Sequence, residues 1–178
     1  MTRMSIGEIN RKAYANVARM DTYCREALGA ELYDLIKLRA SIVNGCGFCV
    51  DMHSTDLAAM GMPWRRIIAV SAWRHAGALF DDRERSVFAL TDAVTRIGPD
   101  SVTDEIWDAV AAHFDAEAIG DLLVAISTIN VWNRLAISTK TVPAVDDSGD
   151  AGDARDSEDS EDSATPGEGA DAPATPAP

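Results

Sequence analysis

Residues 44–53 of the chain read Asn44-Gly45-Cys46-Gly47-Phe48-Cys49-Val50-Asp51-Met52-His53. Two of the three cysteines lie three residues apart here, and a histidine follows four residues after the second. Positions three and four apart share one face of an α-helix, so a helix that begins near Cys46 aligns Cys46, Cys49 and His53 in one column. The stretch therefore predicts a redox site on a helix.

The residues before the first cysteine predict where this helix begins. Asn44 is a good N-cap, and Gly45 permits a sharp change of direction between two helices. Cys46 then lies in the first turn, where unpaired backbone N–H groups and the helix dipole favour a thiolate. His53, one turn beyond Cys49, is placed to take a thiol proton or to stabilise a thiolate. Helix position thus favours Cys46 as the more acidic thiol, whereas the spacing to His53 favours Cys49.

The remaining sequence predicts an all-α fold, with a single domain of about six to seven helices over residues 1–145. Apolar residues recur at helical spacing, and we find no alternating strand pattern and no internal repeat. The last helix is apolar on most of its circumference, which predicts burial in the domain or against a partner chain. From the start and stop signals, the expected helices span residues 5–28, 31–43, 46–60, 63–76, 83–97, 103–114 and 115–139. The last three are expected to begin at Asp81-Asp82, Thr103 and Asp115, and Gly29 and Gly61 are expected to end the first and the third. The second helix places Leu35, Leu38 and Ile42 on one side.

Charge is distributed unevenly along the chain. Of its 178 residues 47% are hydrophobic, which is enough for one domain with a substantial core. Residues 146–178 hold eleven of the 29 acidic residues and one basic residue, so the net charge of −13 leaves only about −3 on residues 1–145. This tail has no aromatic residue, and its composition predicts disorder. The chain has no dense stripe of Lys and Arg, which argues against nucleic-acid binding.

The sequence predicts no association with a membrane. Residues 1–8 contain no apolar run of the kind that a signal peptide has. The uncharged window between Leu122 and Trp132 is far too short to cross a bilayer. We therefore expect a cytoplasmic protein, and in a reducing compartment a transient catalytic disulfide is more plausible than a stable structural one.

The stretch from Tyr33 to His53 resembles the core motif of the alkylhydroperoxidase D-like (AhpD) branch of the carboxymuconolactone decarboxylase family. The resemblance lies in the Leu-Arg-Ala-Ser-x-x-Asn-Gly lead-in, the Cys-x-x-Cys pair and the following histidine. It covers roughly residues 25–143. Further matching segments are Arg83-Glu84-Arg85, Leu90-Thr91-Asp92-Ala93-Val94-Thr95 and Ile129-Asn130-Val131-Trp132-Asn133-Arg134-Leu135-Ala136. The resemblance implies an all-helical fold that forms homotrimers or homohexamers, and a thiol peroxidase or disulfide reductase that needs no cofactor.

The resemblance also implies roles for four residues. In such family members the second cysteine, here Cys49, is the peroxidatic thiolate, and the first, here Cys46, resolves it. A carboxylate twelve residues before the first cysteine joins the histidine, here His53, in a proton relay. That carboxylate is Asp34, one methylene shorter than the glutamate of the best-studied branch. The implied substrates are alkyl hydroperoxides, and the implied electron donor is an external dithiol or a lipoyl-type reductant.

Other interpretations of the same residues stay open at this stage. Cys46, Cys49 and His53 are possible zinc ligands, although one helix face rarely surrounds an ion. Attachment of c-type haem requires the histidine directly after the second cysteine, where this chain has Val50. Two alternative functions also stay open. The chain is either a non-catalytic oligomeric module whose thiols sense oxidation, or an enzyme with the lactone decarboxylase activity of the wider family. Cys24, alone on the first expected helix, is predicted to be a core residue.

Overall fold

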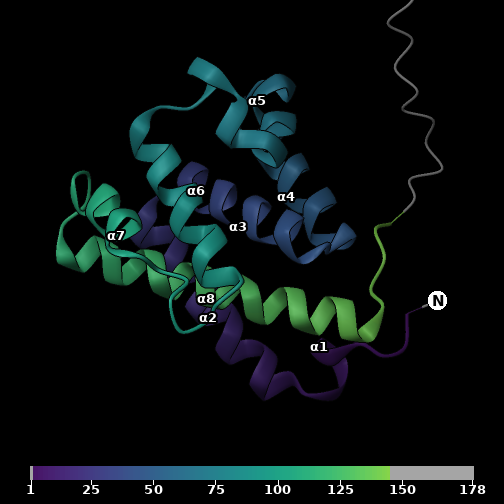
Figure 1. The fold of residues 1–178 in the computed structure, drawn as a ribbon. Helices are drawn as coiled ribbons and strands as arrows, with labels where there is room; N and C mark the ends of the chain where they lie inside the picture. The colour runs from purple at the N-terminus through teal and green to yellow at the C-terminus, as the bar shows by residue number, and fades with distance from the viewer. Residues whose placement is uncertain (1, 145–178) are drawn as a thin grey trace, which may run out of the picture. The chain divides into compact units, whose positions relative to one another are not determined.

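The computed structural model describes residues 2–144, and the predicted acidic tail of residues 146–178 lies outside the described residues. Within residues 2–144 every regular element is a helix, which confirms the all-α prediction. No helix of this part is long and apolar enough to cross a membrane. The elements are α1 (Ile6–Ile9), α2 (Arg11–Leu28), α3 (Ala30–Asn44), α4 (Gly47–Ala59), α5 (Trp64–Ala69), the 3₁₀ helices η1 (Val70–His75) and η2 (Gly77–Leu79), α6 (Asp82–Thr95), α7 (Asp104–Ala111) and α8 (Ala116–Thr139) (Figure 1).

Two of the expected helices are each divided in the structure. The helix expected over residues 5–28 breaks at Asn10, whose φ of −122° and ψ of 60° are not helical. Asparagine competes with the helix through local hydrogen bonds to the backbone, so it favours helix ends. The helix expected over residues 63–76 becomes α5 and η1, with a further kink at Ala72. The described residues therefore contain more helices than the six to seven that the pattern indicated.

The predicted starts of α6, α7 and α8 and the predicted ends of α2 and α4 agree with the structure. The side chains of Asp81, Thr103 and Asp115 each accept a hydrogen bond from the backbone N–H three residues later. These bonds satisfy donors that the first turn of a helix leaves unpaired. Gly29 and Gly61 follow α2 and α4 with φ of 79° and 88°. Capping chemistry is local, which is why the sequence alone identified these positions.

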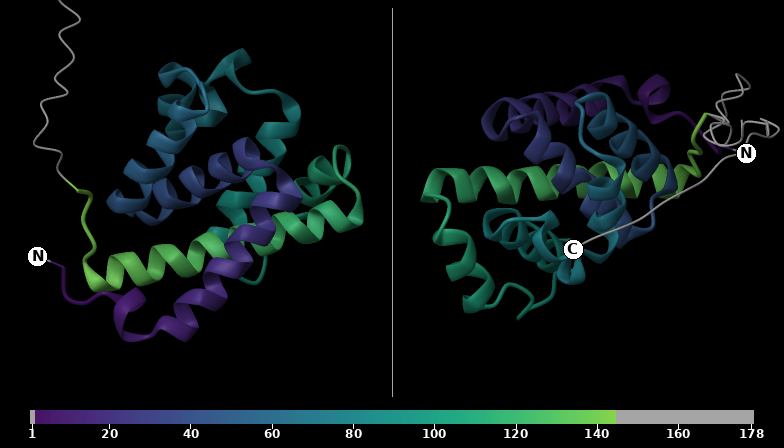
Figure 2. Two further views of the ribbon diagram at one scale, coloured as in Figure 1. Left: turned by 180° about the vertical axis from the view of Figure 1, so that it is seen from behind. Right: turned by 90° about the horizontal axis from the view of Figure 1, so that it is seen from above.

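α3 is the central helix of the fold. It packs against α2, α4, α6 and α8, and Figure 2 shows it enclosed by these neighbours. Residues 32–41 are all buried, although the sequence pattern indicated only one apolar face. α8 buries one side, while Val124, Val131 and Ile137 on it stay exposed. α8, whose composition is the most uniformly apolar, is therefore less enclosed than α3, which carries buried charged residues.

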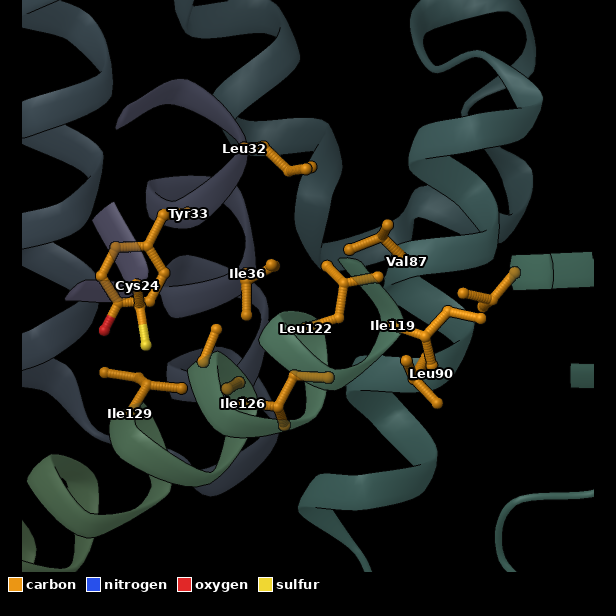
Figure 3. Close-up of a cluster of buried hydrophobic side chains, with 13 residues drawn as sticks. Cys24, Leu32, Tyr33, Ile36, Val87, Leu90, Ile119, Leu122, Ile126 and Ile129 are labelled. Atoms are coloured by element: carbon orange, nitrogen blue, oxygen red, sulfur yellow. The ribbon is translucent and has the colours of Figure 1, made fainter. Parts of the chain in front are cut away.

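Two clusters of buried side chains use different sides of α3. The first joins α2, α3, α6 and α8 (Figure 3) and includes Cys24, Tyr33, Ile36, Leu122, Ile126 and Ile129. The second joins α3 to α4, α5, η1 and α6 and includes Leu35, Leu38, Leu57, Val70 and Phe88. Cys24 is fully buried in the first cluster, in agreement with its predicted place in the core.

A buried ion pair connects α3 to α6. Arg39 donates to both carboxylate oxygens of Asp92, at 2.5 and 3.0 Å, and Arg74 donates to the same carboxylate at 2.6 Å. Burial would raise the pKa of Asp92, but the hydrogen bonds and charges of the two arginines outweigh it and hold the pKa below its usual range. Arg39 also donates to the backbone carbonyls of Val70 and Ser71, so one guanidinium joins α3, α6 and η1.

Replacement of Asp92 is expected to destabilise the fold strongly. Asp92→Ala leaves the Arg39 charge buried without its counter-charge, and we expect the free energy of unfolding to fall by about 3–5 kcal/mol. Urea denaturation followed by circular dichroism measures the change. The exposed Asp108 of α7 serves as control, since Asp108→Ala should stay within about 0.5 kcal/mol of the parent. Equal stability of the two variants would contradict the role given to the pair.

Candidate active site

The turn between α3 and α4 positions the two cysteines. Gly45 has a left-handed φ of 70°, which glycine adopts without the strain that a Cβ imposes. Its N–H donates to the carbonyl of Ile42 at 3.2 Å, and the N–H of Cys46 donates to that of Ser41 at 2.9 Å. These two bonds form a Schellman motif. α4 then begins at Gly47 with Cys46 as its N-cap, so the Cys46 thiol lies at the positive end of the helix.

Asn44 is not the N-cap that the sequence predicted. It is the last residue of α3, because the Gly45 turn ends that helix one residue later than expected. The Asn44 amide instead donates to the side-chain oxygens of Asn130 and Asn133 in α8, at 2.9 and 2.8 Å. Asn133 donates in turn to the hydroxyl of Ser41 at 3.0 Å. The asparagines of α8 therefore fix the end of α3 from which the cysteine turn departs.

The two sulfur atoms lie in contact. The Sγ atoms of Cys46 and Cys49 are 2.7 Å apart and share a hydrogen bond. Both cysteines are free thiols and both are buried. A disulfide bond measures about 2.05 Å, so only a small side-chain movement separates this arrangement from a bridged one. The geometry therefore permits reversible disulfide formation without rearrangement of the helix.

The shared hydrogen bond makes the two thiols unequal. The hydrogen bond with the Cys49 side chain lowers the pKa of Cys46 to about 7, against the opposing effect of burial. The same hydrogen bond and burial raise the pKa of Cys49 well above its usual range. The first proton lost by the pair therefore leaves a charge on Cys46, as its helix position predicts, and this charge disfavours a second ionisation.

The Asp34 carboxylate is buried among cationic groups. Lys37 Nζ lies 2.6 Å from Asp34 Oδ1, and Arg25 donates to Oδ2 at 2.9 Å. His53 Nδ1 lies 3.5 Å from Oδ1. Burial would raise the pKa of Asp34, but His53, Lys37 and Arg25 outweigh it and lower the pKa to about 2. Asp34 is therefore a fixed negative charge at every pH at which the protein is expected to work.

His53 is buried on α4 between two carboxylates. Its Nδ1 atom is 3.5 Å from Asp34 and 3.7 Å from Oδ2 of Asp56. Neither ring nitrogen has a hydrogen-bond partner within the described residues. Buried polar atoms without a partner are uncommon in proteins and often mark sites of chemistry. The imidazole is therefore placed to exchange a proton beside a permanent negative charge.

A cavity of about 690 Å³ opens beside these residues. Its walls include Cys49, His53, Lys37, Arg25 and Asp56. Cys46 does not line the cavity, so of the two hydrogen-bonded cysteines only Cys49 forms part of its wall. The structure thus brings the four predicted site residues together but gives the two thiols different access to a ligand.

The residues that come closest to a metal site do not include the cysteines. Among the described residues, Asp34, His53 and Asp56 place possible ligand atoms within 4.8 Å of one another. Lys37 and Arg25 already neutralise Asp34. A further cation at Asp34 would be repelled by both side chains. The donor set therefore suits an ion pair beside a histidine better than a metal ion.

Two cations of this site were not identified from the sequence. Lys37 lies three residues after Asp34 on the same helix, a spacing that could have revealed the pair. Arg25 lies on α2, and no local pattern links it to Asp34, because only the packing of α2 on α3 brings the two side chains together. Both residues set the charge of the predicted proton relay.

The comparisons with known proteins support the family that the sequence motif resembles. The profile of the carboxymuconolactone decarboxylase family matches residues 11–93. Over 137 residues the chain is 34% identical to the uncharacterized protein YdfG of Bacillus subtilis, a match that covers 76% of this chain and 92% of YdfG.

Solved structures with a similar fold include two informative cases. A protein of unknown function from Agrobacterium tumefaciens, suggested to be the antioxidant defence protein AhpD, is 35% identical with a TM-score of 0.77. That match covers 82% of this chain and 99% of the other. The debrominase Bmp8, solved as a variant with 2,3,4-tribromopyrrole, is 18% identical with a TM-score of 0.66, over 76% of this chain and 72% of Bmp8. The second likeness is one of fold.

The reduced protein should contain one thiol that ionises close to neutral pH. Thiolate formation, followed by ultraviolet absorbance, should rise with pH through a midpoint of about 7. Cys46→Ser should abolish this transition because it removes the thiol that ionises first. Cys24→Ser should retain it, since burial raises the pKa of Cys24. A single midpoint at about 8.5, the ordinary value of a cysteine, would refute the proposed coupling.

Proposed function

Because this chain belongs to the carboxymuconolactone decarboxylase family and is AhpD-like, we propose that it is a thiol-dependent peroxidase that reduces organic hydroperoxides. One observation carries the proposal. Two free thiols lie 2.7 Å apart, and Cys49, the one on the cavity wall, is one helical turn from His53. This arrangement supports two-electron chemistry that alternates between a dithiol and a disulfide.

The proposed cycle has three steps. The Cys49 thiolate attacks the hydroperoxide, so an S–O bond forms, the O–O bond breaks, and the alkoxide takes a proton to leave as an alcohol. The Cys46 thiolate then attacks the sulfenic acid, which forms the S–S bond and expels hydroxide, released as water after protonation. An external dithiol finally reduces the disulfide and becomes oxidised itself. One hydroperoxide and one dithiol thus yield one alcohol, one water and one disulfide.

The protons of this cycle follow the hydrogen bond between the sulfurs. The resting charge of the parent protein is on Cys46, so the proton of Cys49 passes to Cys46 along the 2.7 Å contact before Cys49 attacks. That proton later leaves Cys46 with the expelled hydroxide as water. His53, which also lines the cavity, supplies the proton that the departing alkoxide needs.

Asp34 acts in this scheme as a fixed charge. Lys37 and Arg25 hold it ionised, so its negative charge faces His53 Nδ1 at 3.5 Å and orients the ring. A carboxylate with a pKa of about 2 accepts a proton poorly at neutral pH. Because Asp34 stays ionised beside its two cations, His53 is the residue that moves the proton in this scheme.

Further properties of the proposed enzyme follow the family resemblance. We propose a cytoplasmic homotrimer or homohexamer that is reduced by a dithiol such as dihydrolipoamide. The exposed side chains of Trp64 and Ile68, one turn apart on α5, are apolar surface that another subunit would cover. Residues 1–145 form the proposed helical domain, and residues 146–178 are the proposed acidic tail, which lies outside the described residues.

The two cysteines should give different defects. Cys49→Ser should abolish consumption of cumene hydroperoxide in the presence of dihydrolipoamide, because the attacking sulfur is gone. Cys46→Ser should consume one equivalent and stop, with a sulfenic acid on Cys49 that dimedone labels and mass spectrometry detects. Cys24→Ser is the matched control and should keep full turnover.

Other outcomes separate the remaining candidate functions. Retained turnover in Cys49→Ser would transfer the attack to Cys46. Consumption of a single equivalent by the parent chain, with dithiol in excess, would indicate a redox sensor instead of an enzyme. Loss of carbon dioxide from a lactone substrate would indicate the decarboxylase chemistry of the wider family.

Removal of the Lys37 charge should raise the pKa of Asp34. In Lys37→Met this pKa should rise from about 2 toward the ordinary value of about 3.9, since the nearest cation is lost. Asp34 is then protonated, and its charge lost, at a higher pH as acid is added. NMR titration of the Asp34 side-chain carboxyl carbon measures the midpoint, and Lys37→Arg should restore much of the parental value. Lys12→Met, at an exposed position of α2, is the control, and an unchanged midpoint in Lys37→Met would contradict this role.

A further inference from the structure

The walls of the cavity differ in chemical character. One set of lining residues is polar or charged, and it includes Arg25, Lys37, His53 and Asp56. A second set of lining residues is apolar and comes from the N-terminal segment, α2 and the C-terminal half of α8. Its largest members are Met4, Ile6, Tyr14, Trp132 and Leu135. The cavity is thus amphipathic, and Cys49 forms part of its wall.

Tyr14 and Trp132 form the aromatic part of this wall. Their rings meet edge to face, with centroids 4.8 Å apart and an interplanar angle of 62°. Trp132 also packs against the core, whereas the Tyr14 side chain remains 43% exposed. Core packing therefore holds Trp132 of α8 in place, while Tyr14 of α2 stays accessible to a ligand.

Hydrogen bonds hold the N-terminal segment against α8. The backbone N–H of Arg3 donates to the carbonyl of Thr139 at 2.7 Å, and the Arg3 guanidinium donates to that of Ser138 at 3.2 Å. In Figures 1 and 2 the start of the chain accordingly lies beside the C-terminal end of α8. Met4 and Ile6 follow directly, so these bonds fix two apolar residues of the wall.

The size of the cavity favours a large ligand. Its volume of about 690 Å³ falls within the range of about 300–1,000 Å³ that is typical of sites for small organic molecules. One water molecule occupies about 30 Å³ in the liquid, and hydrogen peroxide is little larger. A cavity built for hydrogen peroxide alone would need no aromatic wall.

The charges of the cavity favour a neutral ligand. Arg25 and Lys37 line it and are both paired with Asp34, and His53 lies between the carboxylates of Asp34 and Asp56. Asp21 and Asp56 add negative charge to the walls. An anionic substrate such as a carboxylate would therefore find no unpaired cation here.

We propose that Tyr14 and Trp132 form a subsite for the apolar body of a neutral organic hydroperoxide with an aromatic or branched group, and that this subsite sets the specificity of the Cys49 reaction. This inference rests on the proposed peroxidase function. The ring contact and the apolar side chains around it bind the body of the substrate, while the peroxide group reaches Cys49. Tyr14 and Trp132 touch substrate but take no part in the transfer of electrons.

Steady-state kinetics with two oxidants test the specificity. We expect kcat/KM to be higher for cumene hydroperoxide than for hydrogen peroxide, and Tyr14→Ala to lower the ratio of the two values about fivefold to tenfold, mainly through KM for cumene hydroperoxide. Tyr14→Phe keeps the ring and should keep the ratio. Tyr23→Ala is the matched control, because Tyr23 is an exposed tyrosine of α2 that bonds to Asp121 and does not line the cavity.

A binding measurement separates this inference from the proposed function. Titration calorimetry of the reduced parent protein with 2-phenyl-2-propanol, the alcohol that cumene hydroperoxide yields, should show binding that Tyr14→Ala weakens and Tyr23→Ala does not. Binding with this pattern but without turnover of any hydroperoxide would support the subsite and refute the peroxidase. Turnover with an unchanged oxidant ratio in Tyr14→Ala, or absence of binding to the parent, would overturn the subsite.

Discussion

The left-handed turn at Gly45 is the constraint on which the rest of the site depends. It ends α3 with a Schellman motif and starts α4 after one further residue, Cys46. Because the two helices then pack against each other, His53 of α4 meets Asp34 of α3, nineteen residues earlier in the chain. A residue with a Cβ at Gly45 would be strained in this conformation. The same turn therefore places a thiol at a helix N-terminus and a histidine against a carboxylate.

The central place of α3 requires that every buried charge on it has a counter-charge. Asp34 is paired with Lys37 and Arg25, and Arg39 is paired with Asp92. An unpaired charge at these depths would cost several kcal/mol, so each pair also restricts how the neighbouring helix packs. One pair connects α3 to α6 and stabilises the fold, while the other determines the charge beside His53. Fold and site thus depend on the same helix and on the same kind of interaction.

The sequence predicted what local chemistry determines. Asp81, Thr103 and Asp115 cap helices as expected, and Cys46, Cys49 and His53 lie at the spacing that the motif indicated. Features that arise from packing were missed. Arg25 reaches Asp34 from another helix, Asn44 bonds to α8 instead of capping α4, and α3 is buried on all sides. Sequence spacing describes one helix at a time, whereas these contacts exist only after several helices have packed together.

The unequal thiols suit the two halves of the proposed cycle. A more basic thiolate is a stronger nucleophile, and a less basic one is a better leaving group. Cys49 lines the cavity, so it is the thiol that a hydroperoxide can reach once Cys46 has taken its proton. When a dithiol later attacks the disulfide at Cys49, the sulfur expelled is that of Cys46, whose thiolate the start of α4 stabilises. The low pKa of Cys46 is therefore compatible with attack by Cys49, since the acidity of one thiol and the access of the other serve different steps.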